Sequence, residues 1–442
     1  MLKNHFYWFL FMPVLASGAE FSADSILSFQ AAENVKNGYL SKSELSYENK
    51  FDSTFSDDSR FHMDTRFLAV LNGNLEPGKP YQAALSPVDA RHCVFDRCKD
   101  QFELREFYYR TDIKDASLIL GKQRVVWGEA DGVPVLDVVN PFSYREFILE
   151  EQEASRIPTW MANFKIPIHQ FDIQLLWIFD QAYSVFTRNG AEFELTSPRL
   201  VPNAPIPAGL NVNVIELPQE KPNRALEDSD YGAKISTTIK SWDVSLNYLY
   251  YYDRNPVFLR YFSATPGGLN VAIEQAYERI KTFGGTASTS FNDFVFRSEL
   301  ARTPSRLIMN YDINDYDGVL KTSDTSYVLG LDYFGLSESF ISAQLYQSIL
   351  SNHVPDLSRP KADTIYTFLY RKDFSNQSRS VEARWLYSRN DQDGLYRIKL
   401  IEKPRDSLHF SLGIDSFYGT KSGIFGQFKR NDRVMFGVDW FF

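Results

Sequence analysis

The sequence has no apolar run of about 18 residues, and it contains little histidine or cysteine. Without such a run, the chain has no transmembrane helix. Its six histidines form no close cluster, and neither an H-E-x-x-H nor a G-x-S-x-G motif occurs. We therefore predict that the chain is not an enzyme and that it holds no metal and no cofactor.

Concentrated positive charge is also missing. The chain has 47 basic and 56 acidic residues, which gives a net charge of -9, and its basic residues are scattered along the sequence. Nucleic-acid-binding domains need a basic patch or stripe. Nucleic acid is therefore not expected among the partners.

The first 19 residues have the order of a secretory signal. A positive charge at Lys3 precedes the apolar stretch 6–16, and the small residues Ser17, Gly18 and Ala19 follow. This order predicts a signal peptide over residues 1–19 that is cleaved near Ala19. The alternative is a buried first strand or helix. Residues 20–442 would then form the mature domain.

Two cysteines, Cys93 and Cys98, lie five positions apart. An exported chain meets an oxidising periplasm, so a disulfide between them is the expected state. The rival interpretation is a metal site. Two thiols with His92 nearby are too few ligands for a closed zinc site, which needs four.

The rest of the chain alternates repeatedly between apolar and polar residues. In segment 242–252 one face carries Trp242, Val244, Leu246, Tyr248, Tyr250 and Tyr252, and the other carries Asp243, Ser245 and Asn247. The same alternation recurs near residues 171–180, 231–240, 293–300 and 408–415. It predicts half-buried strands. Lengths of about 10 to 13 residues suit tilted membrane-spanning strands better than soluble ones.

The connections between these strands alternate in length. Short turns are expected near Asp57, Ala116, His169, Lys240, Asn292, Ser337, Asn376 and Arg405. Longer segments are expected at 74–100, 128–156, 183–229, 254–270, 303–323, 350–361 and 418–431, with short exceptions near Asn37 and Asp391. This plan predicts an all-β, transmembrane antiparallel β-barrel of about 18 strands, with short periplasmic turns and long extracellular loops. The sheet must close because lipid offers no hydrogen bonds.

The residue types on the two faces of the predicted strands indicate what surrounds the barrel and what it encloses. The chain has 36 Phe, 25 Tyr and 7 Trp, and such residues gather in the interfacial girdles of membrane barrels. Outer-membrane lipid and lipopolysaccharide are therefore expected partners. The inward residues inferred from parity carry both charges: Lys50, Arg66, Lys165, Lys234, Arg297, Arg384, Arg397 and Lys399 against Glu44, Asp64, Asp172, Asp243, Asp293, Glu299 and Glu382. Since neither sign dominates, this list predicts no ion preference.

Segment 121–158 carries the most unusual run of charged residues. Gly128 and Gly132 would allow a sharp departure from a strand, and Ser143 with Glu146 fits a helix capping box that predicts a short helix from about 141 to 152. Residues 128–157 either fold into the lumen and constrict it or form a lid held by salt bridges. The candidate pore and constriction residues are Lys122, Arg124, Glu129, Asp131, Arg145, Glu146, Arg156 and Lys165.

The last strand ends in an aromatic residue. Val434, Phe436, Val438, Trp440 and Phe442 share one parity. Such an ending resembles the terminal signal that the bacterial barrel-assembly machinery recognises, so Trp440 and Phe442 are predicted to carry that signal and the machinery to be a partner.

Two stretches resemble a broad Gram-negative outer-membrane barrel family described as a domain of unknown function. The first is a Gly-x-Gln…Trp-Gly-Glu…Asn-Pro element, here Gly121, Gln123, Trp127, Gly128, Glu129, Asn140 and Pro141. The second is the closing stretch 425–433. The resemblance implies a barrel exported to the outer membrane, and it implies no substrate.

These expectations lead to a porin-like outer-membrane channel for a polar or amphiphilic solute. The first alternative is the outer-membrane component of a lipid or polymer export system, which would need a periplasmic partner. The second is a barrel that sheathes or docks a partner protein.

Overall fold

The computed structural model describes residues 20–75, 91–93, 100–130, 132–187, 190–202, 211–218, 221–222, 224–266, 268–374 and 377–442. The signal peptide at 1–19, Asp131 and Cys98 lie outside these residues. The signal peptide and the Cys93–Cys98 disulfide therefore stay predictions.

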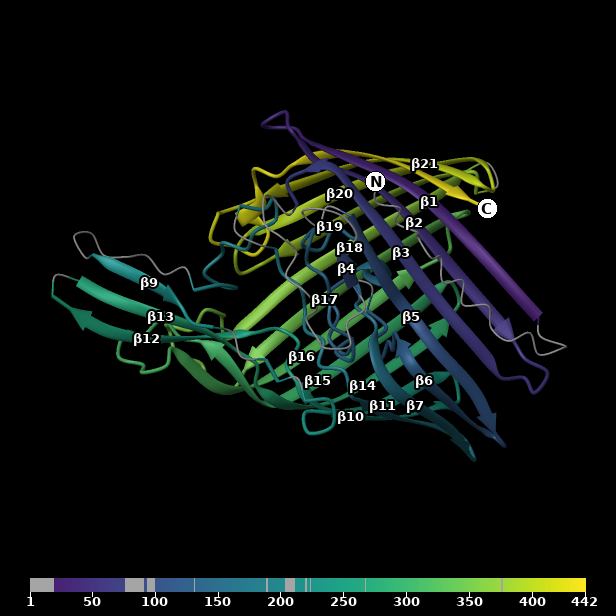
Figure 1. Ribbon diagram of the computed structural model, residues 1–442, viewed down its shortest axis with the longest axis horizontal. Helices are drawn as coiled ribbons and strands as arrows, with labels where there is room; N and C mark the ends of the chain where they lie inside the picture. Colours follow the sequence, from purple (N-terminus) through teal and green to yellow (C-terminus); the bar gives the residue numbers. More distant parts are fainter. Residues whose placement is uncertain are drawn as a thin grey trace, which may run out of the picture.

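Eighteen antiparallel strands close into a barrel (Figure 1). The barrel strands are β1 (Glu20–Asn34), β2 (Leu40–Thr54), β3 (Arg60–Gly73), β5 (Asp100–Ile113), β6 (Ala116–Gln123), β7 (Thr159–Ile168), β8 (Phe171–Ile178), β10 (Asp230–Ile239), β11 (Trp242–Tyr252), β14 (Arg279–Phe291), β15 (Phe294–Met309), β16 (Val319–Tyr333), β17 (Ser339–Leu350), β18 (Ala362–Phe374), β19 (Arg379–Ser388), β20 (Asp393–Arg405), β21 (Leu408–Tyr418) and β22 (Arg433–Phe441). A three-residue strand, β4 (Arg91–Cys93), pairs with β5 beside them.

The first and last strands form the seam that closes the barrel. β1 pairs with β2 along one edge and with β22 along the other, from Ile26 opposite Phe441 to Asn34 opposite Arg433. Closure gives each of the eighteen strands a hydrogen-bonded neighbour on both sides, as a lipid environment requires. The predicted fold class and strand number are confirmed.

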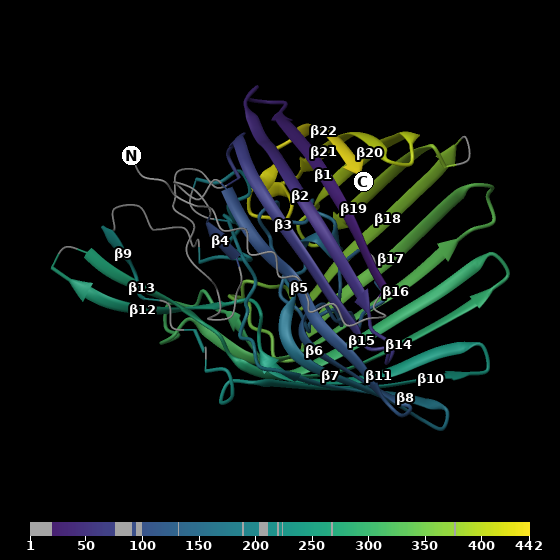
Figure 2. The same ribbon diagram turned by 45° about the vertical axis from the view of Figure 1, so that its right-hand side comes forward.

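The connections alternate as predicted. At one rim the chain reverses in tight turns, several of which place a non-glycine residue at positive φ, as at Lys114, His169, Lys240 and Asn292. Figure 2 shows many of these turns together at one end of the barrel. The longer connections 124–158, 179–229 and 253–278 join strands at the other end. The barrel therefore has one plain rim and one elaborated rim.

The elaborated rim carries a small sheet that the sequence did not predict. Strands β12 (Val257–Thr265) and β13 (Gly268–Ala276) form a hairpin, and β9 (Val212–Glu216) pairs with β13 in parallel. The three strands project away from the barrel (Figures 1 and 2). The long loop expected over 254–270 is therefore a hairpin, and the loop expected over 303–323 is shorter, because β15 reaches Met309 and β16 begins at Val319.

The outer face of the barrel is apolar and the inner face is largely polar. Leu246 and Ile398 expose 68% and 49% of their surface to the outside, whereas the side chains of Ser245, Asn247 and Arg397 are buried on the inner face. The terminal residues Trp440 and Phe442 are 52% and 61% exposed. Among the described residues, no helix is long and apolar enough to cross a membrane.

The interior is more apolar than parity predicted. One buried cluster joins Trp127 and Val139 to Met161, Ile178 and other wall residues. A second joins Phe147 and Phe193 to Leu386, Phe417 and Phe428. In both clusters, apolar residues of connecting segments pack against inward-facing residues of the strands. Part of the lumen is therefore filled by packed side chains.

The helix predicted over residues 141–152 is absent, and that prediction was wrong. Phe142 forms a β-bridge with Arg156, and Ser143 forms one with Val185. Phe147 has a φ of 56°, which a right-handed helix cannot accommodate. The Glu146 carboxylate is held by Lys42 and Arg433 instead of capping a helix. A single helical turn, α1 (Gln152–Ser155), follows.

Candidate functional site

The connection between β6 and β7, residues 124–158, lies inside the barrel, and we call it the inner loop. Its backbone is held to one wall by Glu299 on β15. The carboxylate of Glu299 accepts hydrogen bonds from the amides of Glu129, Ala130 (2.6 Å) and Leu136 (3.1 Å). Glu299 is 3% exposed, so these hydrogen bonds are shielded from water.

The other end of the inner loop is held to the seam. Arg145 pairs with Glu44 on β2, and Glu146 pairs with Lys42 on β2. Arg433, the first residue of β22, reaches Glu146 at 2.8 Å. The inner loop therefore crosses the lumen from β15 to the strands on either side of the closure.

A hydrogen-bonded clasp joins the two ends of the inner loop. The side-chain oxygen of Asn140 accepts from the Val125 amide at 2.8 Å, and its amide group donates to the Ile157 carbonyl oxygen and the Thr159 hydroxyl. It also donates to the Gln123 carbonyl oxygen at 3.2 Å. One buried side chain thus fixes the points where the loop leaves β6 and returns to β7.

The inner loop approaches the wall most closely at Gly132. A Cβ added there would lie 2.8 Å from Thr367 Oγ1 and Cγ2 on β18, and the Gly132 amide donates to Gln344 on β17 at 3.2 Å. Gly128 and Gly132 were expected to bend the chain sharply. Neither has a positive φ. At position 132, glycine is needed for this close approach.

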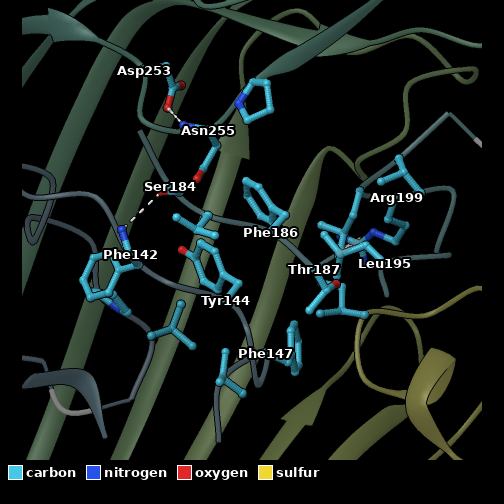
Figure 3. A pocket seen from close by; sticks show the side chains of 18 of the residues that line it. Phe142, Tyr144, Phe147, Ser184, Phe186, Thr187, Leu195, Arg199, Asp253 and Asn255 are labelled. Carbon is cyan, nitrogen blue, oxygen red and sulfur yellow. Dashed lines mark hydrogen bonds between the residues drawn. The ribbon is translucent and has the colours of Figure 1, made fainter. Parts of the chain in front are cut away.

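A cavity of about 1240 Å³ lies between the inner loop, the connection 179–229, the projecting sheet and the barrel wall, and we call it the vestibule. Figure 3 shows Phe142, Tyr144, Phe147 and Phe186 gathered around it. The Tyr144 and Phe186 rings are stacked, with centroids 5.0 Å apart. The vestibule reaches down to Gly132 and Gln152 of the inner loop and to Gln344, Thr367, Arg384 and Arg397 of the wall.

Charged groups surround this largely apolar surface, and six arginines line it. They pair with carboxylates as follows: Arg145 with Glu44, Arg199 with Asp363 and Asp391, Arg306 with Asp253 and Asp324, Arg359 with Asp324, Arg384 with Glu382, and Arg397 with Asp415. The pairs of Arg145, Arg199, Arg306 and Arg359 join connecting segments to strands, whereas those of Arg384 and Arg397 lie within the wall of the barrel.

The inner loop also contains side chains whose pKa values differ from their ordinary ones. Burial would raise the pKa of Glu146, but the charges of Lys42, Arg433 and Arg145 together hold it well below its usual range. Burial raises the pKa of Asp137 despite its ion pair with Arg156. Burial also raises the pKa of Tyr144 to about 12, so its hydroxyl stays neutral. The carboxylate that joins the loop to the seam is thus ionised at neutral pH.

The model of one protein family, "Protein of unknown function (DUF1302)", matches residues 72–369, which is more than half of the chain. The chain belongs to the DUF1302 family. A comparison with curated proteins found no significant match. Three of the residues that carried the resemblance in the sequence fix the inner loop of this DUF1302 barrel: Asn140 donates to the carbonyl oxygen of Gln123 at the end of β6, and Trp127 donates to Gln174 on β8.

Solved outer-membrane barrels share the fold of the DUF1302 barrel. OccAB3 of Acinetobacter baumannii is 12% identical, with a TM-score of 0.51 over 96% of this chain and 99% of that chain. OccK8 (OprE) of Pseudomonas aeruginosa is 10% identical, with a TM-score of 0.53 over 96% and 98% of the two chains. OpdK of Pseudomonas aeruginosa, solved with vanillate, is 10% identical, with a TM-score of 0.52 over the same shares. At this identity the likeness shows the fold alone.

The structure brings several predicted site residues together. Glu129, Arg145, Glu146 and Arg156 lie in the inner loop within the lumen of the DUF1302 barrel, each with a hydrogen-bond or ion-pair partner. Arg124 is the first residue of the inner loop, and it pairs with Glu106 on β5 and with Glu153.

Two predicted residues lie elsewhere. Lys122 is 2% exposed and donates to the Leu104 carbonyl oxygen at 2.9 Å, so it is part of the barrel wall. Lys165 is exposed near the plain rim, three residues before β7 ends. Asp131 lies outside the described residues.

Several residues that shape the site were not predicted as part of it. Parity had placed Glu44 and Glu299 inside the lumen, but no local motif shows that their partners are more than one hundred positions away. Lys42, Gln344, Thr367 and Arg433 were not singled out, because their roles depend on contacts between distant strands and the loop. Arg433 does lie in the stretch 425–433 that carried the family resemblance.

Proposed function

We propose that this DUF1302 barrel is a channel of the Gram-negative outer membrane and that its inner loop narrows the passage for a polar or amphiphilic solute. One observation carries the proposal. The inner loop is held to β15 on one side and to the seam strands on the other, directly below a cavity of about 1240 Å³.

The barrel surface and the fold support the membrane location. Apolar side chains such as Leu246 face outward along the strands, while buried polar residues face inward, which is the arrangement of membrane-spanning barrels. One solved barrel of the same fold, OpdK of Pseudomonas aeruginosa, is described as an outer membrane protein. The solute itself is not given by that likeness.

The passage we propose runs from the vestibule along the wall formed by β17 to β20. There the inner loop contributes Gly132 and Gln152, and the wall contributes Gln344, Thr367 and Arg384. At this wall Glu151 of the inner loop faces Lys399 on β20 at 3.7 Å, and opposite charges on the two sides of a narrow aqueous path create a transverse field that orients polar solutes. Selection would therefore depend on the polar groups at this level.

Single-channel recording in planar bilayers tests the proposal. The purified wild-type barrel should give small, discrete conductance steps, and deletion of residues 128–157 should increase the step size severalfold because the lumen opens. A Leu246→Ile variant, changed on the outer face, should conduct as the wild type does. A folded barrel that shows no conductance, with or without residues 128–157, would overturn the proposed function.

A further inference from the structure

The vestibule contains one positive charge that differs from the six arginines. Lys221 lines it, and among the described residues no carboxylate lies within ion-pair distance of its ammonium group. Two of the carboxylates that line the vestibule have cations of their own: Glu278 pairs with Lys321, and Asp253 pairs with Arg306.

Two aromatic rings hold this ammonium in place. The Lys221 Nζ lies 5.8 Å from the ring centroid of Tyr183 and 5.7 Å from that of Tyr277. The two rings contact each other, with centroids 3.9 Å apart, and Tyr183 is fully buried. Burial lowers the pKa of Lys221, which marks a charge with incomplete solvation. A bound anion would supply the counter-charge that the Lys221 ammonium group lacks within the described part of the chain.

The vestibule that Lys221 lines also carries apolar and aromatic surface. Toward the lumen the vestibule is lined by the stacked pair Tyr144 and Phe186 and by Phe142. Toward the outside it is lined by Val214 of β9 and Ile273 of β13, on the sheet that projects from the rim. The cavity volume is above the usual range of about 300–1,000 Å³ for pockets that hold drug-sized ligands.

We propose that the vestibule is a binding site for an amphiphilic organic monoanion, whose acidic group pairs with Lys221 and whose apolar ring system lies against Tyr144 and Phe186. This assignment of a solute class rests on the proposed channel, in which the vestibule is the outer entrance. The projecting sheet extends the apolar surface beyond the rim, where such a molecule would first make contact.

Equilibrium dialysis against the full-length barrel in nanodiscs tests this site without requiring conductance. The probes are naphthoate, the uncharged naphthylmethanol and the cationic naphthylmethylammonium, each corrected for binding to empty nanodiscs. We expect naphthoate to bind at least tenfold more tightly than either of the other probes. A Lys221→Gln variant should lose about tenfold in naphthoate affinity and bind naphthylmethanol as before, and Lys221→Arg should retain naphthoate binding.

Two further variants separate charge from apolar contact. Phe186→Ala should weaken binding of naphthoate and naphthylmethanol alike, since it removes ring contact. Lys240→Gln, which removes an exposed lysine at a plain-rim turn, should change neither. Equal affinity for the three probes, or wild-type naphthoate binding by Lys221→Gln, would overturn the inference. Probe binding as expected by a barrel that does not conduct would overturn the proposed channel and leave the binding site standing.

Discussion

The Glu299 carboxylate on β15 accepts the amide hydrogen of Ala130 at a distance of 2.6 Å, although the two residues are 169 positions apart in the chain. The same carboxylate accepts from Glu129 and Leu136, so one buried acid holds a complete turn of the inner loop against the wall. Three backbone amides would be left without an acceptor if it were removed.

Replacing Glu299 by alanine should therefore release this part of the inner loop. We expect the single-channel conductance to rise and its noise to increase, since the freed segment would fluctuate within the lumen. Hydrogen bonds to charged groups are each worth about 1.5–3 kcal/mol. Glu299→Gln retains one carbonyl acceptor and should give an intermediate result. Unchanged conductance in a folded Glu299→Ala barrel would mean that the loop does not depend on this contact.

Glu146 makes the stability of the barrel depend on acidity. The cations Lys42, Arg433 and Arg145 lower its pKa in the folded state below the ordinary value of 4.5. The ionised form is thus favoured by folding, so its contribution is complete above about pH 4.5 and is lost as the pH falls below that value toward the folded-state pKa.

We expect Glu146→Gln to lower stability at pH 7 by about 3–5 kcal/mol, because Arg433 is left buried without one of its partners. The difference from the wild type should shrink below pH 4. Thermal unfolding in detergent, followed by the change in electrophoretic mobility, measures both effects. Glu151→Gln is the matched control, since Glu151 lies in the same loop and is 52% exposed in its pair with Lys399. An equal loss in both variants would contradict this role of Glu146.

Gly132 and Thr367 should behave as a coupled pair. A methyl group at position 132 would lie 2.8 Å from the Thr367 side chain, and overpacking of this kind costs about 1–3 kcal/mol. Gly132→Ala should therefore destabilise the barrel, and Thr367→Ala should relieve much of that loss in the double variant. A double-mutant cycle of unfolding free energies checks the coupling. Strict additivity would show that the loop does not press against β18 here.

The outer face can be tested with a charge. Leu246, 68% exposed in the middle of β11, should tolerate arginine poorly, with a loss of about 2–4 kcal/mol in lipid vesicles. Ser241→Arg places the same charge in the adjacent turn, where the loss should be less than 1 kcal/mol. Equal stability of the two variants in folding titrations would place Leu246 outside the bilayer.

Much of this fold could be predicted from the sequence, because the two environments of a membrane barrel impose an alternation of apolar and polar residues along each strand. The alternation in segment 242–252 reports the two faces of one strand, and the tight turns near His169 and Lys240 follow from strand length. The hairpin at 257–276 was missed because its strands lie beyond the barrel, where they do not have to match the thickness of a bilayer.

Entry of the inner loop into the lumen was one of two interpretations that the sequence left open, and the conformation of the loop could not be predicted. The capping-box pattern at Ser143 and Glu146 favours a helix locally, and tertiary contacts outweigh it, since ionic bonds to Lys42 and Arg433 require Glu146 in another place. Glu299 on β15 and Thr367 on β18 contact the loop from strands that are far along the chain from β6 and β7. A pattern in neighbouring residues of the sequence cannot predict contacts between the inner loop and distant strands.

Arg433 begins the last strand and contacts both Asp415 on β21 and Glu146 of the inner loop. The inner loop therefore gains this contact only when β22 is in place, and β22 is in turn supported from inside the barrel by the loop. One residue thus couples the closing strand of the barrel to the position of the inner loop. A barrel that lacks β22 would therefore also lack the buried cation that holds Glu146 from the wall side.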